Sequence, residues 1–152
     1  TFYQQDALQM ELEDGTFDVV WNCGVLEHFY DPGKLQLIRE MRRITRPGGL
    51  VFIAVPNHLH LPFMLGKKLA ELRGIWPYGF EDDLTPRRLD GLARQAGLES
   101  YELFAYNAVG GWAFLPLGKR LMRFLGLDTL EMHSRRTRWG HMICLNALKP
   151  EA

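Results

Sequence analysis

Glu27 and His28 form the polar pair best suited to chemistry, and they follow the apolar run Phe17–Cys23 (FDVVWNC) by a few residues. A histidine can remove a proton from a reacting group near neutral pH. It can also do no more than orient its own loop through a hydrogen bond. The sequence leaves both roles open for His28, so the elements around the pair decide what it can reach.

A strand, a helix and a second strand are predicted to position this pair. Phe17–Cys23 is rich in β-branched and aromatic residues, which predicts a strand buried on both faces. Lys34–Thr45 predicts an amphipathic helix and Leu50–Val55 a second buried strand. The apolar positions of the helix are Leu37, Ile38, Met41 and Ile44, and its expected outer face carries Arg39, Glu40, Arg42 and Arg43. Strands joined by such a helix are parallel neighbours, and ligands bind beyond their carboxyl ends, where the polar pair stands.

The rest of the chain continues the alternation of helices and strands. Thr85-Pro86 predicts a helix start and Gly97 its end. Strands are expected over Leu98–Ala108 and Trp139–Leu148, and Thr1–Gln5 could be the tail of another. The predicted class is α/β.

Composition excludes several classes of protein. The 152 residues suit a single domain, and 18 basic side chains balance 18 acidic ones, so no global charge indicates nucleic acid. Cys23 and Cys144 lie in apolar runs without metal spacing, which predicts free thiols and a cytoplasmic protein. No apolar run approaches the roughly 18 residues of a membrane span. Because the chain opens at Thr1 without a methionine, we expect a fragment or a processed product.

Three motifs in order resemble one family. The segments FDVVWNCGVLEH, RPGGLVFIAVPN and DDLTPRRLDGLARQAGLES are similar to the carboxy-terminal part of class I S-adenosylmethionine-dependent methyltransferases of type 11/23, without their Gly-rich cofactor motif. The resemblance implies a partial Rossmann-like sheet with flanking helices. It would hold strands 4, 5, 7 and 6 of the family, with the last strand of the chain antiparallel.

The same resemblance implies a cofactor site for S-adenosylmethionine. Asp6 and Ala7 match the positions that contact the adenine, where the carboxylate accepts a hydrogen bond from the exocyclic amine. Asn22, Cys23 and Gly24 match the strand tip beside the methionine portion. His28 then lies on the side of the methyl acceptor, where it is the candidate catalytic base.

Glu27-His28 also resembles part of the E-x-x-E-H metal motif of ubiquinone-pathway O-methyltransferases and small-RNA 2′-O-methyltransferases. Gly24 stands where that motif has its first glutamate. Three hard ligands become two, so the sequence predicts no metal site.

Two insertions, residues 58–79 and 110–138 of the single expected domain, flank the predicted entry of the acceptor. Both combine apolar residues with lysine and arginine. They could form a lid over an apolar acceptor, rest on a membrane surface, or only cover the sheet and each other.

The function implied is methyl transfer to a small-molecule or lipid-like acceptor, with O-methylation the first expectation, by an enzyme of which this chain is a part. Because the family's first strands precede Thr1, we expect this chain alone to be inactive and to bind the cofactor poorly. Strand 17–23 then becomes an exposed apolar edge that favours a homodimer. The alternative function is a non-catalytic, degenerate half-domain that acts as an oligomeric scaffold.

Overall fold

The computed structural model describes residues 2–127 and 139–151. The strands of this part are β1 (Phe17–Cys23), β2 (Thr45–Pro56), β3 (Ser100–Tyr106) and β4 (Met142–Leu148). The helices are α1 (Asp31–Ile44), α2 (Leu61–Leu72), α3 (Pro86–Gln95) and α4 (Gly118–Phe124), with short 3-10 turns η1 (Leu26–His28) and η2 (Gly110–Phe114).

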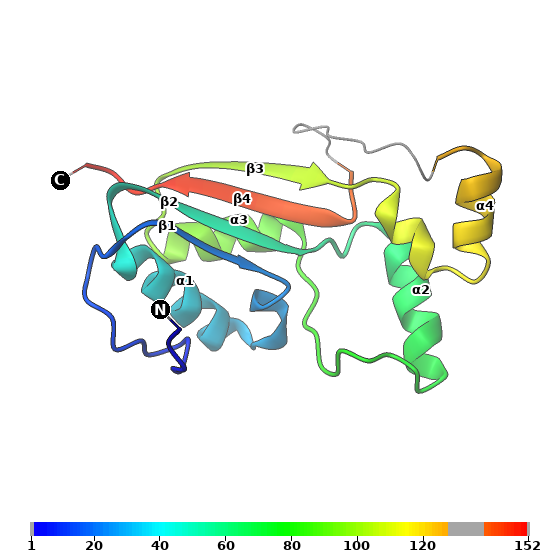
Figure 1. Ribbon diagram of the computed structural model, residues 1–152, viewed down its shortest axis with the longest axis horizontal. Helices are drawn as coiled ribbons and strands as arrows, with labels where there is room; N and C mark the ends of the chain where they lie inside the picture. Colours follow the sequence, from blue (N-terminus) through cyan, green and yellow to red (C-terminus); the bar gives the residue numbers. More distant parts are fainter. Residues whose placement is uncertain (1, 128–138, 152) are drawn as a thin grey trace.

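The strands form one mixed sheet in the order β1-β2-β4-β3 (Figure 1). β1 is parallel to β2, whereas β4 runs antiparallel to both β2 and β3. This order and the antiparallel last strand confirm the predicted partial methyltransferase sheet. The helix predicted from Lys34 is also present as α1, which begins earlier, at Asp31, and gives way to β2 at Thr45.

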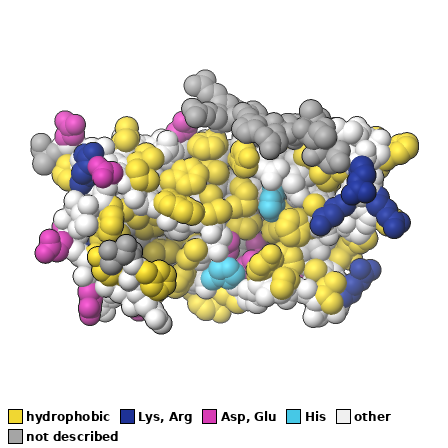
Figure 2. Space-filling view, viewed as in Figure 1, with side chains coloured by type: hydrophobic (Ala, Val, Ile, Leu, Met, Phe, Trp, Pro, Cys, Tyr) yellow, Lys and Arg dark blue, Asp and Glu magenta, His cyan; other side chains and the backbone are white. Residues whose placement is uncertain are grey.

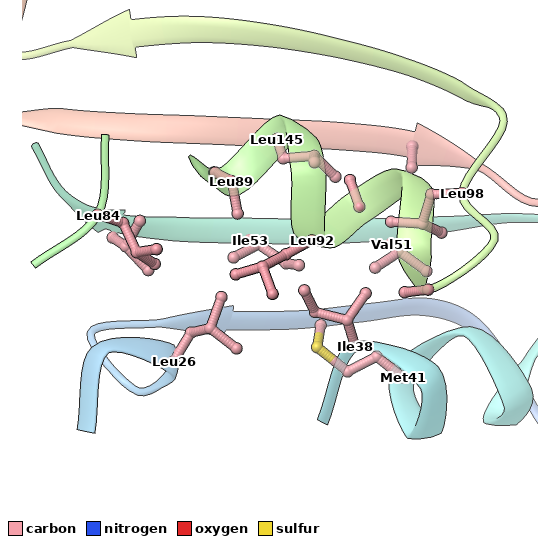
Figure 3. Close-up of a cluster of buried hydrophobic side chains, with 14 of the residues drawn as sticks. Leu26, Ile38, Met41, Val51, Ile53, Leu84, Leu89, Leu92, Leu98 and Leu145 are labelled. Atoms are coloured by element: carbon pink, nitrogen blue, oxygen red, sulfur yellow. The ribbon is translucent and has the colours of Figure 1, made fainter. Parts of the chain in front are cut away.

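The hydrophobic core lies between the sheet and the two helices α1 and α3, which cover the same face (Figures 1 and 3). Alternate residues of the central strands, such as Val51, Ile53 and Leu145, are fully buried there because side chains alternate across a strand. Thr85 caps α3 as predicted, since its hydroxyl accepts the backbone N–H of Arg88.

The opposite face of the sheet has no helix against it among the described residues, and hydrophobic side chains gather on it (Figure 2). On β1, Val19 is 51% exposed and Trp21 is 67% exposed. The prediction that this strand is buried on both faces is therefore wrong. A run of apolar residues indicates burial in a complete sheet, but within the described part of the chain β1 pairs with β2 alone and is covered from one side.

Residues 2–14 run beside α1 and form no strand, so the strand tail expected before Asp6 is not found at residues 2–5. The backbone N–H of Met10 donates to Glu40 Oε2 (3.0 Å), and Arg43 donates to the carbonyl oxygens of Met10 and Leu12. Glu40 is consequently buried rather than on the outer face of the helix as predicted.

The two insertions meet each other. α2 lies in the first, and η2 and α4 lie in the second, whose residues 128–138 fall outside the described part. Gly66 of α2 approaches η2 so closely that an added Cβ would lie 2.6 Å from Phe114. Among the described residues, no helix is both long and apolar enough to cross a bilayer.

Candidate functional site

Gly24 turns the chain sharply at the tip of β1. Its φ is +68°, a conformation that L side chains rarely adopt, and its N–H donates to the carbonyl of Ala54 on β2 (3.0 Å). The turn leads directly into η1, which places Glu27 in the interior and His28 at the surface. The polar pair therefore lies at the carboxyl end of β1, as the sequence indicates.

A pocket of about 200 Å³ opens at this tip. Gly24, Glu27, His28 and Glu81 supply its polar wall. Its other lining residues come from the insertions and from the ends of β2 and β4 (Pro56, Phe63, Trp76, Tyr78, Phe114, His141 and Met142). The volume is below the roughly 300–1,000 Å³ of typical ligand pockets, so it accommodates a ring-sized group rather than a whole cofactor.

Aromatic rings from both insertions build the apolar wall of this pocket. The ring centroids of Phe63 and Phe114 are 5.0 Å apart in an edge-to-face arrangement, and those of Trp76 and Tyr78 are 5.2 Å apart. His141 stacks beside them, and burial, together with the nearby His60, lowers its pKa to about 4. It is therefore neutral at physiological pH.

The ring of His28 is held in one orientation. Its Nδ1 lies 2.8 Å from the carbonyl oxygen of Phe80. A carbonyl only accepts, so Nδ1 carries a proton and donates it, and in the neutral imidazole the lone pair is then on Nε2. The loop-orienting role of His28 thus has a named partner, and Nε2 keeps the lone pair that a base or a metal ligand needs.

Glu27 is a buried carboxylate without adequate compensation. It is 2% exposed, and its Oε2 has no hydrogen-bond partner among the described residues. Burial raises its pKa and outweighs a backbone hydrogen bond and His28, which lower it, while the negative charges of Glu81 and Asp83 add a smaller increase.

Lys67 of α2 reaches the same cluster. Its Nζ lies 2.7 Å from Glu81 Oε2, 2.7 Å from Asp83 Oδ1 and 5.7 Å from the centroid of the Trp76 ring. Burial works to lower the pKa of Lys67, but its interactions with the carboxylates of Asp83 and Glu81 together outweigh burial, and the pKa is raised. The ammonium therefore stays charged and fixes the position of Glu81.

Of the predicted cofactor residues, only Gly24 lines this pocket. Asp6 is exposed, and its Oδ1 accepts the N–H of Leu8 (2.9 Å) in a local turn, next to the partly buried Ala7. Asn22 donates from Nδ2 to the sulfur of Met41 (3.0 Å), whereas Cys23 is an exposed free thiol. The cofactor contacts of these residues stay predictions.

Sequence reasoning missed Glu81 and Lys67. Glu81 stands in an acidic run, Glu81-Asp82-Asp83, just before the cap of α3, and Lys67 belongs to one face of α2. The acidic run was a visible signal. Its approach to Glu27 depends on the path of the connection between α2 and α3, for which the sequence holds no periodic pattern.

Comparisons with known proteins agree with this fold. Residues 1–53 match the family described as methyltransferase domain. The chain is 36% identical over 99 residues to the ubiquinone biosynthesis O-methyltransferase of Thiobacillus denitrificans, covering 61% of this chain and 42% of the relative. It is 31% identical over 123 residues to the enzyme of the same name from Pseudomonas aeruginosa, covering 77% of this chain and 50% of the relative. The chain thus spans about half the length of these relatives.

Among solved structures, a methyltransferase from Archaeoglobus fulgidus described as dependent on S-adenosylmethionine superposes with a TM-score of 0.66 at 14% identity, covering 97% of this chain and 66% of that one. A methyltransferase from Thermotoga maritima, described as a possible histamine N-methyltransferase, has a TM-score of 0.64 at 16% identity, with 95% and 62% covered. The chain therefore has the class I S-adenosylmethionine-dependent methyltransferase fold. It carries the part of that fold that ends with the antiparallel strand.

Proposed function

We propose that the complete protein transfers the methyl group of S-adenosylmethionine to an oxygen of a small, apolar or lipid-like acceptor. The observation that carries this proposal is the pocket at the tip of β1, which joins an aromatic wall from both insertions to the polar wall of Glu27, His28 and Glu81. In this step the sulfonium–methyl bond breaks with its electron pair going to sulfur, a methyl–oxygen bond forms, and the acceptor hydroxyl passes its proton to water at the polar wall. Similarity to ubiquinone biosynthesis O-methyltransferases supports oxygen as the acceptor atom.

The test is methyl transfer from labelled S-adenosylmethionine by the complete protein, with long-chain phenols as acceptors. Methylation of these phenols is expected. Trp76→Ala should raise KM about tenfold by removing a ring from the apolar wall. Transfer to nitrogen but not to any oxygen acceptor would contradict the proposal.

Because the chain spans about half the length of the relatives, we propose that residues 1–152 alone bind the cofactor poorly. Micromolar binding of S-adenosylhomocysteine to residues 1–152 alone, measured by calorimetric titration, would contradict this expectation.

Exposed apolar side chains on the two insertions support the proposal of a lipid-like acceptor. Within the two insertions, Leu61, Leu72, Leu117 and Phe124 are between 70% and 86% exposed. Lysine and arginine side chains cluster on the same insertions (Figure 2), and they come from α2 and α4 (Lys68, Lys119, Arg120 and Arg123). An exposed apolar surface rimmed by basic groups suits an anionic membrane surface. Co-sedimentation with phosphatidylglycerol vesicles should be lost in Phe124→Glu and kept in Tyr30→Glu.

The scaffold alternative rests on the uncovered sheet face and the free edge of β1. Trp21, at 67% exposure, offers a large apolar contact to a second copy of the chain. Sedimentation velocity decides it: a dimer that Trp21→Lys dissociates favours the scaffold, and a monomer at all concentrations excludes it.

A further inference from the structure

We infer that Glu27, His28 and Glu81 form a divalent-cation site, in which Glu81 supplies the ligand that Gly24 does not. Their ligand atoms lie within 4.8 Å of one another at the pocket wall. Donors about 2.0–2.5 Å from a shared ion are roughly 3–4.5 Å apart, so only a small closure of the side chains is needed. The inference concerns metal binding and does not rest on the proposed methyl transfer.

Glu81 is held in this position from both sides along the chain. The carbonyl of Phe80, before it, accepts the hydrogen bond from His28 Nδ1, and the N–H of Asp82, after it, donates to the carbonyl of Glu27 (2.8 Å). The segment 80–82 is thus fastened to η1 on each side of Glu81. A long connection between helices would otherwise carry a large entropy cost to bring a ligand to a distant partner.

His28 has the arrangement of a ligating histidine. Metal-bound imidazoles usually donate their other ring N–H to a carboxylate or a backbone carbonyl, which fixes the tautomer and aims the lone pair. The hydrogen bond from Nδ1 to Phe80 fixes the tautomer in this way and leaves Nε2 as the ligand atom of the neutral ring. A nitrogen that binds a cation cannot also accept a proton, so this assignment replaces the role of His28 as a base.

The charges of the cluster call for a cation. Glu27, Glu81 and Asp83 bring three carboxylates, and Lys67 is the ammonium that pairs with two of them. Glu27 is 2% exposed, and its Oε2, which has no partner among the described residues, belongs to a side chain that lines the pocket. Leaving such a carboxylate buried and uncompensated is costly, whereas a divalent ion balances the two excess negative charges.

The donor set also limits the choice of ion. Two carboxylates and one imidazole suit borderline cations such as Mn²⁺ better than Mg²⁺, which prefers oxygen donors alone, or Cu⁺, which prefers sulfur. Three protein ligands leave further positions open toward the pocket, where water or an oxygen of a bound molecule can enter.

The experiment is a titration of residues 1–152 with Mn²⁺, followed by the electron paramagnetic resonance signal of the free ion. One tightly bound Mn²⁺ per chain is expected. Glu81→Gln should weaken binding at least about 100-fold, because it removes a ligand, whereas Asp83→Asn removes the same charge from the same cluster and should weaken it only severalfold. Equal effects of the two variants would show charge attraction without a site and would overturn the inference.

Thermal unfolding keeps the test decisive if a variant folds poorly. Mn²⁺ should raise the Tm of the unsubstituted chain by several degrees and leave the Tm of Glu81→Gln unchanged. No rise in Tm and no bound Mn²⁺ at millimolar concentration in the unsubstituted chain would also overturn the inference.

Discussion

Two buried lysines, Lys34 and Lys67, pair with neighbouring carboxylates of the same acidic segment, residues 81–83, in different electrostatic surroundings. Lys34 of α1 is fully buried and pairs with Asp82, which also accepts from Arg88, and Arg88 in turn bonds Asp31. That network has two cations and two anions. Lys67 of α2 is also buried and pairs with Glu81 and Asp83, whose charges also act on the buried Glu27. The first cluster, around Lys34, is therefore balanced in charge and stabilises the fold. The second cluster, around Lys67, has an excess of negative charge, as a cation-binding site does.

The largest effect is expected from removing the lone cation of the second cluster. Lys67→Met leaves three carboxylates without an ammonium and should lower the unfolding free energy by about 3–5 kcal/mol in metal-free buffer. Saturating Mn²⁺ should restore most of this loss, since the ion replaces the missing positive charge. Urea unfolding with and without Mn²⁺ measures both values, and a loss that Mn²⁺ leaves unchanged would separate Lys67 from the proposed site.

The matched substitution in the first cluster should have a smaller effect without rescue. In Lys34→Met, Asp82 keeps its bonds to Arg88, so the unfolding free energy should fall by about 1–2 kcal/mol. Mn²⁺ should stabilise this variant as much as the unsubstituted chain and no more. If Mn²⁺ stabilised Lys34→Met more than the unsubstituted chain, both clusters would attract the ion, and the proposed difference between them would be wrong.

The first cluster should also lose its contribution in acid. The hydrogen bond from Arg88, against a smaller effect of burial, lowers the pKa of Asp82 from 3.8 to about 2. A lowered folded-state pKa stabilises the fold above the unfolded value and stops doing so as the pH falls through the folded one. The Tm of Asp82→Asn should therefore lie below that of the unsubstituted chain near neutral pH, and the gap should close between pH 4 and 2. A difference in Tm that persists at pH 2 would show that Asp82→Asn acts through packing rather than through charge.

The smallest effect has the opposite sign. Glu27→Gln removes an uncompensated buried charge and should raise the unfolding free energy of the metal-free chain by about 1 kcal/mol, while it abolishes the stabilisation by Mn²⁺. Differential scanning calorimetry measures both changes. A loss of stability in metal-free buffer would show that Glu27 is already balanced.

Much of the fold could be predicted because its signals are local and periodic. Leu37, Ile38, Met41 and Ile44 recur at helical spacing, and all four are buried in α1. Thr85 and Pro86 mark the start of α3 by their own chemistry. The order of the strands was predicted from the resemblance to class I methyltransferases, because no local sequence pattern indicates which strands are neighbours in the sheet.

The misses depend on contacts between distant segments. Trp21 has the side chain of a core residue, but its burial depends on what covers the second face of the sheet. Glu40 has the side chain of a surface residue, and residues 2–14 bury it. Likewise, the candidate site was predicted at Glu27 and His28 from adjacent residues, whereas Glu81 enters it across a connection with no periodic pattern.

Anomalous diffraction from crystals of residues 1–152 soaked in Mn²⁺ tests the central claim most directly. The expected result is one strong peak between Glu27, His28 Nε2 and Glu81, with ligand distances of roughly 2.0–2.5 Å. A map without a peak at this place, or with His28 Nε2 turned toward another partner while Mn²⁺ binds elsewhere, would contradict it.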